Sequence, residues 1–405
     1  MLMTSLVVIV VAGFVLESIL DYLNDANSGA ALDPAIKDLY DQNERKRSIA
    51  YAHERYRVSF FSATMSSVVM VLALTQGWFG KVDSWARGVT GNSILISLIF
   101  VGAISLISWL LGFPFSIYST FVIEERYGFN KTTPLTFIQD TIKGAVVSLV
   151  IATPLLAAVV WFYQRFGSGF WIYAWALVAL FSVFMFMFGT SVILPLFNKL
   201  TPLEDGELKK AILKYCDSQG YKVGRLFVMD GSRRSTKANA FFSGMGKSKM
   251  IVLFDTLIEK LSVEEVVAVL AHEIGHYKLK HTKQMFIAST IQTAAIFALL
   301  GWSLQFDSFA RALGAENTSF HISALVFFIL LTPANILLGL LNNSLSRRNE
   351  FGADAFSKRT YKVAPMKSAL RKISTASLSN LTPHPAYVAF NYTHPPLASR
   401  LRALD

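Results

Sequence analysis

Residues 284–306 decide the fold of this chain, and they read QMFIASTIQTAAIFALLGWSLQF, without one charged side chain. A helix that crosses a bilayer needs roughly 20 apolar residues, whereas an uncharged core helix of a soluble protein rarely exceeds about 14. Comparable uncharged stretches lie at residues 58–80, 88–123, 144–164 and 166–198. Apolar residues make up 53% of the chain and charged ones 16%, so the sequence predicts an α-helical membrane protein and argues against a soluble one.

We predict seven transmembrane helices, near residues 5–23, 58–79, 93–121, 144–163, 172–197, 284–306 and 320–345. Of the 38 Lys and Arg residues, 34 fall in four polar segments, at residues 24–57, 122–143, 198–283 and 346–405. The positive-inside rule therefore places these segments in the cytoplasm and the N-terminus outside, with the inner membrane as the location if the cell is bacterial. This asymmetry explains the net charge of +11, so we predict the lipid bilayer as a partner and no nucleic acid.

The largest polar insertion spans residues 200–283, and its pattern predicts a small α+β unit. We expect a helix at Glu207–Ser218 and strands at Arg225–Met229, Ala238–Ser243 and Met250–Phe254, the last two around Gly244–Gly246. A capping box formed by Ser262 and Glu265 then begins a helix that should run directly into the sixth span.

Four regions follow from this pattern: membrane helices 1–5 with their loops in residues 1–199, the insertion at 200–283, membrane helices 6–7 at 284–346, and a cytoplasmic C-terminal segment at 347–405. Cys216 is the only cysteine, which excludes an intrachain disulfide and a thiolate metal cluster. Glu17 and Asp21 lie in the first span, where they either face a polar interior or lie at the membrane surface.

The helix that begins at Ser262 contains His272-Glu273-Ile274-Gly275-His276, an HExxH sequence. At positions i and i+4 the two imidazoles share one helix face and can bind one zinc ion, while Glu273 can reach an attacking water. The sixth and seventh spans form a hairpin that returns Glu350 to the same side of the membrane, where it can complete a His-His-Glu zinc set. Asp354, one turn later, can orient a ligand histidine.

These residues also have interpretations without catalysis. The HExxH sequence could be an ordinary helix with two surface histidines, and Glu350 and Asp354 could belong to a charged helix start at the membrane surface. His394 could be a polar residue before the turn formed by Pro395 and Pro396.

Six separated blocks of the sequence resemble the CAAX prenyl protease 1 family, which are integral-membrane zinc metalloproteases. The blocks are EERYGFNKTT at 124–133, PLFNKLTP at 195–202, DGSRRSTKANAFFSGMGKSKMIVLFDTL at 230–257, AHEIGH at 271–276, SRRNEFGAD at 346–354 and THPPLASR at 393–400. The resemblance implies seven transmembrane helices around an intramembrane chamber, with a small α+β gluzincin-like zinc protease unit on the cytoplasmic side.

The resemblance also implies roles for single residues. It makes His272, His276 and Glu350 the ligands of one Zn²⁺, Glu273 the general base, Asp354 an acid that orients a ligand or donates a proton, and His394 a stabiliser of the oxyanion. Asn239, Ala240 and Phe241 resemble an edge strand that holds the substrate backbone, and they could equally be an ordinary strand of the sheet.

The family cleaves peptide bonds near the C-terminus of prenylated CAAX-type proteins, so we expect a peptide or protein substrate of this kind. The compact loops are more typical of a bacterial homologue, and most bacteria make no prenylated CAAX proteins. A quality-control protease for membrane proteins is therefore an alternative. A non-catalytic scaffold or transporter is a second alternative, which the intact HExxH sequence and Glu350 disfavour.

Overall fold

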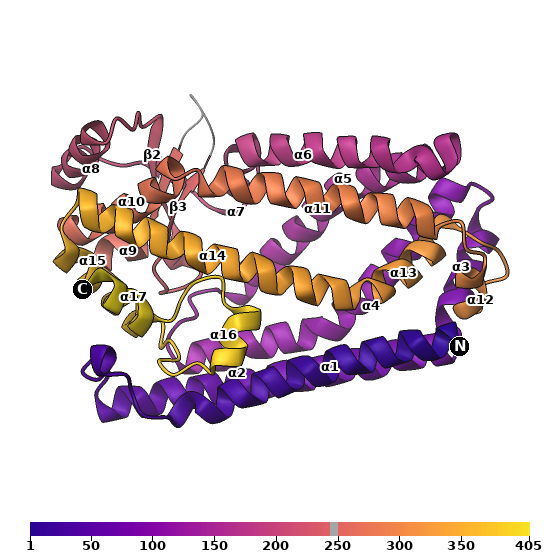
Figure 1. Cartoon of the computed structure of the whole chain (residues 1–405), viewed down its shortest axis with the longest axis horizontal. Coiled ribbons are helices and arrows are strands. Elements are labelled where there is room, and N and C mark those ends of the chain that lie inside the picture. The colour runs from indigo at the N-terminus through magenta and orange to yellow at the C-terminus, as the bar shows by residue number, and fades with distance from the viewer. Residues whose placement is uncertain (244–249) are drawn as a thin grey trace.

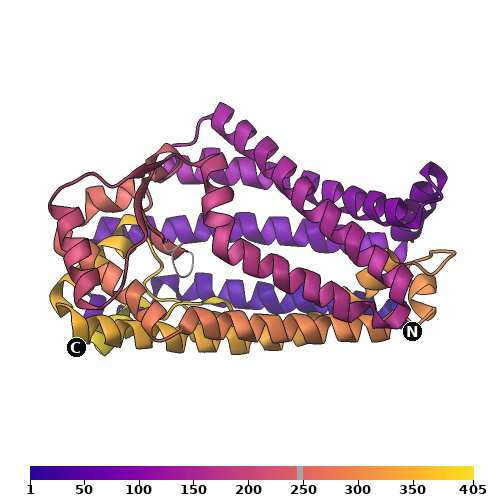
Figure 2. The same ribbon diagram turned by 90° about the horizontal axis from the view of Figure 1, so that it is seen from above.

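The structure is a computed structural model that describes residues 1–243 and 250–405. Long helices run along its length, with the N-terminus at one end and the C-terminus near the other (Figure 1). They are α1 (Leu2–Ala26), α2 (Gln42–Thr75), α4 (Ser93–Tyr118), α5 (Pro134–Phe166), α6 (Phe170–Val192), α11 (His281–Ser303) and α14 (Thr332–Thr360). The strands and the C-terminus gather at one end, here called the site end, and the opposite end is called the far end (Figure 2).

Within the described residues, five helical stretches are long and apolar enough to cross a membrane: Leu2–Gly29, Gln42–Thr75, Ser93–Glu124, Pro134–Phe197 and His281–Ser303. A sixth is obtained if α13 (Phe320–Leu330) and α14 count as one span, although they meet at a bend of 56°. Pro333 lies in the first turn of α14, and a proline there starts a new helix but cannot continue an old one. The chain is therefore a multi-pass integral membrane protein, and the stretch expected as the seventh span, residues 320–345, contains a bend between two helices.

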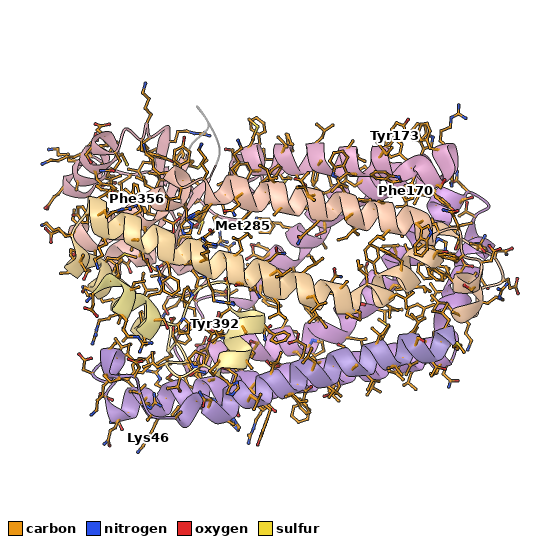
Figure 3. The ribbon with its side chains drawn as sticks, in the orientation of Figure 1. Lys46, Phe170, Tyr173, Met285, Phe356 and Tyr392 are labelled. Carbon is orange, nitrogen blue, oxygen red and sulfur yellow. The ribbon has the colours of Figure 1, made fainter. Side chains whose placement is uncertain are left out.

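The far end is closed by a compact apolar core. The short helices α3 (Trp78–Val89) and α12 (Ser308–Ala312) pack there beside α13, with Phe79, Leu313 and Ile322 almost fully buried. Phe170 and Tyr173 of α6 lie at the same end, as Figure 3 shows. This packing connects the N-terminal helices to the segment between α11 and α14.

A buried polar cluster reinforces the contact between α3, α4 and α13. His321 Nε2 lies 2.7 Å from Asp83 Oδ1, and its Nδ1 lies 3.0 Å from Ser97 Oγ. Asp83 also accepts a hydrogen bond of 2.9 Å from Arg87 Nε. Because Asp83 and His321 are each less than 5% exposed, their pairing satisfies polar groups that would otherwise be costly to bury.

At the far end the backbone of Gly80 lies very close to that of Gly314, so a substitution of Gly80 tests the packing there. A Cβ added at Gly80 would lie 2.2 Å from the carbonyl oxygen of Gly314, so Gly80→Ala should force the two backbones apart. We expect a destabilisation of about 1–3 kcal/mol, measured as a lower Tm of the detergent-solubilised protein. Gly88→Ala in the same helix is the control, because its Cβ would meet nothing within 4 Å. Equal Tm values for the two variants would contradict the packing described here.

The site end carries a four-stranded sheet in the order β1-β2-β4-β3, formed by β1 (Leu200–Pro202), β2 (Arg225–Met229), β4 (Met250–Phe254) and β3 (Ala240–Ser243). β2 and β4 are parallel, whereas β1 and β3 are antiparallel to their neighbours. The predicted bounds of β2 and β4 are confirmed, and β3 begins two residues later than predicted. The predicted turn at Gly244–Gly246 lies outside the described residues.

Six further helices lie at the site end. They are α8 (Glu207–Ser218), α9 (Asp255–Lys260), α10 (Val263–Lys278), α15 (Val363–Ala376), α16 (Pro385–Asn391) and α17 (Leu397–Leu404). Of these, α8, α9, α10 and α15 share a hydrophobic core with the sheet, whereas α16 and α17 contact α14. The predicted helix at Glu207–Ser218 is confirmed, and Cys216 is buried in it. The strand β1 was not predicted, because it is only three residues long and contains a proline.

The connection between α10 and α11 differs from the prediction. The helix that carries the two histidines was expected to run directly into the sixth span, and this is wrong. Lys280 has a φ of +61°, in the left-handed region, and it separates the end of α10 at Lys278 from the start of α11 at His281. The break lets α10 and α11 take different directions.

Candidate metal centre

The close approach of α10 and α14 brings the candidate ligands together. A Cβ added at Gly275 would lie 3.1 Å from Ala353 Cα, so only glycine allows this spacing without displacement. Ser357 Oγ, one turn after Ala353 on α14, donates a hydrogen bond of 3.3 Å to the carbonyl oxygen of Ala268. Phe356, which also faces Gly275, lies at the site end (Figure 3).

The N-terminus of α10 is held by interactions that keep its register. Ser262 and Glu265 form the predicted capping box, with bonds of 3.3 and 2.8 Å. Glu265 also accepts a hydrogen bond of 2.8 Å from Lys372 Nζ of α15. Although burial alone would raise the pKa of Glu265, the hydrogen bonds from Lys372 and Ser368 hold this pKa below its usual value. The helix is therefore anchored at the end opposite its histidines.

Three side chains converge where α10 meets α14. His272 Nε2 lies 3.3 Å from Glu350 Oε2, and His276 Nε2 lies 3.2 Å from Glu350 Oε1. The two Nε2 atoms are 3.2 Å apart, and one ligand atom from each residue falls within a common 4.8 Å. The predicted grouping of two histidines with a distant glutamate therefore exists in the structure.

The chemistry of this group fits a metal ion. Glu350 is only 4% exposed, and its Oε2 is buried without a hydrogen-bond donor among the described residues. A buried carboxylate oxygen that lacks a donor is costly unless a cation satisfies it. Two imidazole nitrogens and one carboxylate oxygen are also a donor set that zinc favours, with a position left open.

Asp354 stabilises the orientation of His272. Its Oδ1 lies 2.8 Å from His272 Nδ1, and its side chain is 1% exposed. Because an ionised carboxylate only accepts hydrogen bonds, Nδ1 carries the proton and Nε2 keeps a lone pair directed at the candidate metal position. Asp354 thus has the geometry expected of a residue that orients a ligand.

Glu273 and His394 lie near the same position. Glu273 follows His272 directly, and burial raises the pKa of its carboxyl group, which makes the carboxylate a stronger base. His394 Nε2 lies 3.4 Å from Glu350 Oε1, while Thr393 Oγ1 and His394 Nδ1 are 2.9 Å apart. The His394 side chain is 62% exposed, so a substrate can reach it.

The stretch Asn239–Phe241 forms the outer edge of the sheet in the described part of the chain. Ala240 pairs with Leu253 and Phe241 with Val252 of β4, and β3 has no second neighbouring strand among residues 1–243 and 250–405. The carbonyl oxygen of Asn239 accepts a hydrogen bond of 3.1 Å from the Phe254 amide. An edge strand of this kind offers backbone groups to an extended peptide.

Comparisons with known proteins place this arrangement in a family. A model described as the N-terminal part of CAAX prenyl proteases, with five membrane helices, matches residues 22–199, and the model of peptidase family M48 matches residues 202–405. The CAAX prenyl protease 1 homolog of Arabidopsis thaliana is 37% identical over 385 residues, covering 92% of this chain and 90% of the relative. This chain belongs to the CAAX prenyl protease 1 family.

Further relatives agree with this membership. CAAX prenyl protease 1 of Saccharomyces cerevisiae is 32% identical over 422 residues, covering 98% of this chain and 93% of the relative. The crystal structure of Ste24p from S. mikatae superposes with a TM-score of 0.95 at 32% identity, over 100% of this chain and 99% of that one. This CAAX prenyl protease 1 family member is therefore a membrane metalloprotease.

Sequence reasoning missed two side chains of this M48 peptidase. Arg400 Nε and Nη2 donate hydrogen bonds of 2.9 and 2.7 Å to the two oxygens of Asp354, forming a bidentate pair. His281 Nδ1 lies 3.1 Å from His276 Nδ1, so one of these nitrogens donates to the other. Arg400 ends the block at 393–400, which signalled its importance, whereas His281 carried no signal because its position depends on the break at Lys280.

Proposed function

We propose that this metalloprotease holds one Zn²⁺ at His272, His276 and Glu350 and hydrolyses peptide bonds near the C-terminus of prenylated CAAX-type substrates. The observation that carries the proposal is the convergence of two imidazole nitrogens and a buried carboxylate oxygen that accepts no hydrogen bond among the described residues. The substrate class is supported by the curated relatives, which are named CAAX prenyl protease 1 in plants, yeast and mammals.

Each residue around the metal position has a separate role in the hydrolysis. When bound, zinc supplies a Lewis acid for the scissile carbonyl and for the attacking water. Glu273 takes the proton from this water and passes it to the leaving amine. His394 donates a hydrogen bond to the oxyanion that develops on the carbonyl oxygen. Asp354, itself held by Arg400, keeps His272 in the tautomer that leaves Nε2 free.

The substrate backbone adds to the free edge of β3. The Asn239 carbonyl already bonds the Phe254 amide, and Phe241 faces the same neighbour, so within Asn239–Phe241 the backbone groups of Ala240 face the free edge, where an extended peptide can add. This mode of binding is nearly independent of side chains, so sequence specificity must come from other contacts.

The membrane arrangement is also part of the proposal. We assign seven spans, because the stretch Pro134–Phe197 contains two helices, α5 and α6, that pack against each other, and because α13 with α14 is counted as one bent span. The spans surround an intramembrane chamber, the N-terminus lies outside, and a gluzincin-like unit and the C-terminus lie in the cytoplasm. The proposed regions are 1–199, 200–283, 284–346 and 347–405, and the boundary near 200 agrees with the two family matches.

The test is a cleavage assay on the purified full chain with a farnesylated CAAX peptide, with and without a zinc chelator. We expect release of the C-terminal tripeptide, loss of turnover in chelator, recovery on adding Zn²⁺, and about one zinc per chain by elemental analysis. Cleavage of an unprenylated membrane protein, but not of the farnesylated peptide, would instead support a quality-control protease. A chain that binds no metal and cleaves neither substrate would support the scaffold alternative.

A further inference from the structure

We infer that a cavity beside the edge strand receives the free α-carboxylate at the C-terminus of the peptide substrate, with Arg55 as its ion-pair partner. The inference deepens the proposed function and rests on it. On this inference, the enzyme selects its substrate by the C-terminal carboxylate of the peptide as well as by the lipid.

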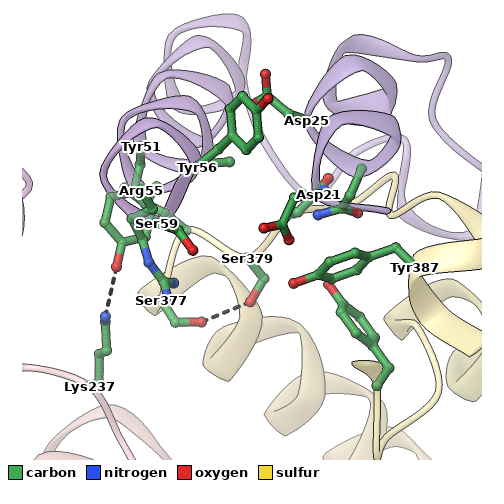
Figure 4. A pocket seen from close by; sticks show the side chains of 15 residues that line it. Asp21, Asp25, Tyr51, Arg55, Tyr56, Ser59, Lys237, Ser377, Ser379 and Tyr387 are labelled. Carbon is green, nitrogen blue, oxygen red and sulfur yellow. Dashed lines mark hydrogen bonds between the residues drawn. The ribbon is translucent and has the colours of Figure 1, made fainter. Parts of the chain in front are cut away.

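The cavity lies at the site end and has a volume of about 490 Å³. Its walls come from α1, α2, the segment around residues 377–380, and α16 with the residue that follows it. Figure 4 shows that its lining is polar, with tyrosine, serine and charged side chains directed into the same space. A cavity of this size and polarity fits the last residue of a peptide with its charged end.

Lys237 connects this cavity to the edge strand. It lines the cavity and precedes Asn239 by two residues, so a peptide that runs along β3 beyond Asn239 enters the cavity. Lys237 Nζ donates hydrogen bonds of 2.9 Å to Tyr51 Oη and 2.8 Å to Glu124 Oε2. The charge of Lys237 is therefore already balanced by Glu124, and its role is to hold the start of the strand against α2.

Arg55 is the cation available to a ligand. Its guanidinium lies 5.5 Å from the centre of the Tyr51 ring, on the same wall as Lys237. Among residues 1–243 and 250–405, Arg55 forms no ion pair with a carboxylate. A planar guanidinium without a counter-charge, facing a polar cavity, is suited to bind a carboxylate through two hydrogen bonds.

The acids of the cavity lie on the opposite wall. Asp21 and Asp25 project from α1, and Figure 4 places Asp21 across the cavity from Arg55, near Tyr387. Asp25 is engaged by His53, whose Nδ1 lies 2.8 Å from Asp25 Oδ2. The cavity therefore has a positive and a negative wall, and a carboxylate is attracted to the Arg55 side and repelled from the α1 side.

The chemistry of the proposed substrate gives the direction of the peptide. The residue before the scissile bond carries the lipid, so that half of the peptide belongs beside the apolar membrane helices. β3 itself contacts the membrane helix α6. The segment just before β3 lies beside the polar cavity, because Lys237 lines that cavity. The free C-terminus therefore points to Arg55. Three residues in extended conformation span about 10 Å, so the cavity would measure the distance from the scissile bond to the chain end.

The experiment compares two farnesylated peptides that differ only at the C-terminus, one a free acid and the other an amide. The purified full chain should show a KM for the acid about tenfold below that for the amide, as expected for one charge-assisted contact. Arg55→Ala should raise the KM for the acid, so that the ratio of the KM values for acid and amide rises to about one. Arg55→Lys should recover part of the difference, because it restores the charge without the planar fork.

Arg57→Ala is the matched control, because Arg57 is an exposed arginine on the same helix that does not line the cavity. It should retain the preference for the acid. Equal KM values for acid and amide in the unmodified protein would overturn the inference and leave the proposed function intact. An equal loss on both peptides in Arg55→Ala would also overturn it. Failure of the unmodified protein to cleave either peptide would refute the proposed function and this inference with it.

Discussion

Glu273→Gln should reduce kcat on a farnesylated CAAX peptide by at least about 10³-fold while the protein retains about one zinc per chain. Glutamine has nearly the same shape as glutamate, but it cannot accept the proton of the attacking water. The carboxylate of Glu273 is also the only acidic group of the HExxH sequence, so no neighbour in that motif can replace it. The measurements are kcat with purified protein and zinc content by elemental analysis.

Glu264→Gln is a suitable control for this prediction. Glu264 belongs to the same helix, but its side chain is 56% exposed and pairs with Lys362 at the surface. Such exposed pairs contribute little, so activity should stay within about twofold. Full turnover in Glu273→Gln would refute its role as the base. Loss of zinc together with activity would show that Glu273 acts through the metal site instead.

Glu350→Gln should lose most of its zinc and, with it, all measurable turnover. The substitution removes the negative charge from a ligand that is 4% exposed and that offers both oxygens to the imidazole pair. Asp354→Asn should have a milder effect, with zinc affinity reduced by about 10–100-fold, because it alters the partner of His272 Nδ1 and the pair with Arg400 but removes no metal ligand. His272→Ala should resemble Glu350→Gln.

Competition with a chelator of known affinity measures these differences as a graded series. The structure predicts that zinc affinity is highest in the unmodified protein, lower in Asp354→Asn and lowest in Glu350→Gln. If Glu350→Gln bound zinc as tightly as the unmodified protein, the assignment of Glu350 as a ligand would be wrong. If Asp354→Asn were as severe as Glu350→Gln, Asp354 would contribute more than the orientation of one imidazole.

Much of the fold was predictable because local patterns encode it. Long uncharged stretches identified the membrane helices, since the bilayer imposes a minimum apolar length. The bounds of β2 and β4 followed from short β-branched and aromatic runs. The bend between α13 and α14 was not predicted because it lies inside one uncharged apolar stretch, and β1 was not predicted because it has only three residues and contains a proline.

The candidate site shows the same division between local and distant contacts. The proximity of His272 and His276 was predicted from their spacing alone, because residues four apart share a helix face. Glu350 was found from the membrane hairpin and the family resemblance. Arg400 and His281 were missed because the contact of Arg400 with Asp354 depends on how α17 approaches α14, and that of His281 with His276 on how α11 approaches α10.

The amino-acid sequence by itself determined that this chain spans a membrane, carries two imidazoles at metal-ligand spacing on one helix, and belongs with the CAAX prenyl proteases. These properties depend on hydropathy, helical periodicity and motif spacing, which act over a few residues. Only the tertiary structure decided that Glu350 reaches both imidazoles, that Arg400 holds Asp354, and that Arg55 faces a cavity beside the edge strand. The reason is physical: helix packing through Gly275 and the turn at Lys280 sets distances that no local pattern contains.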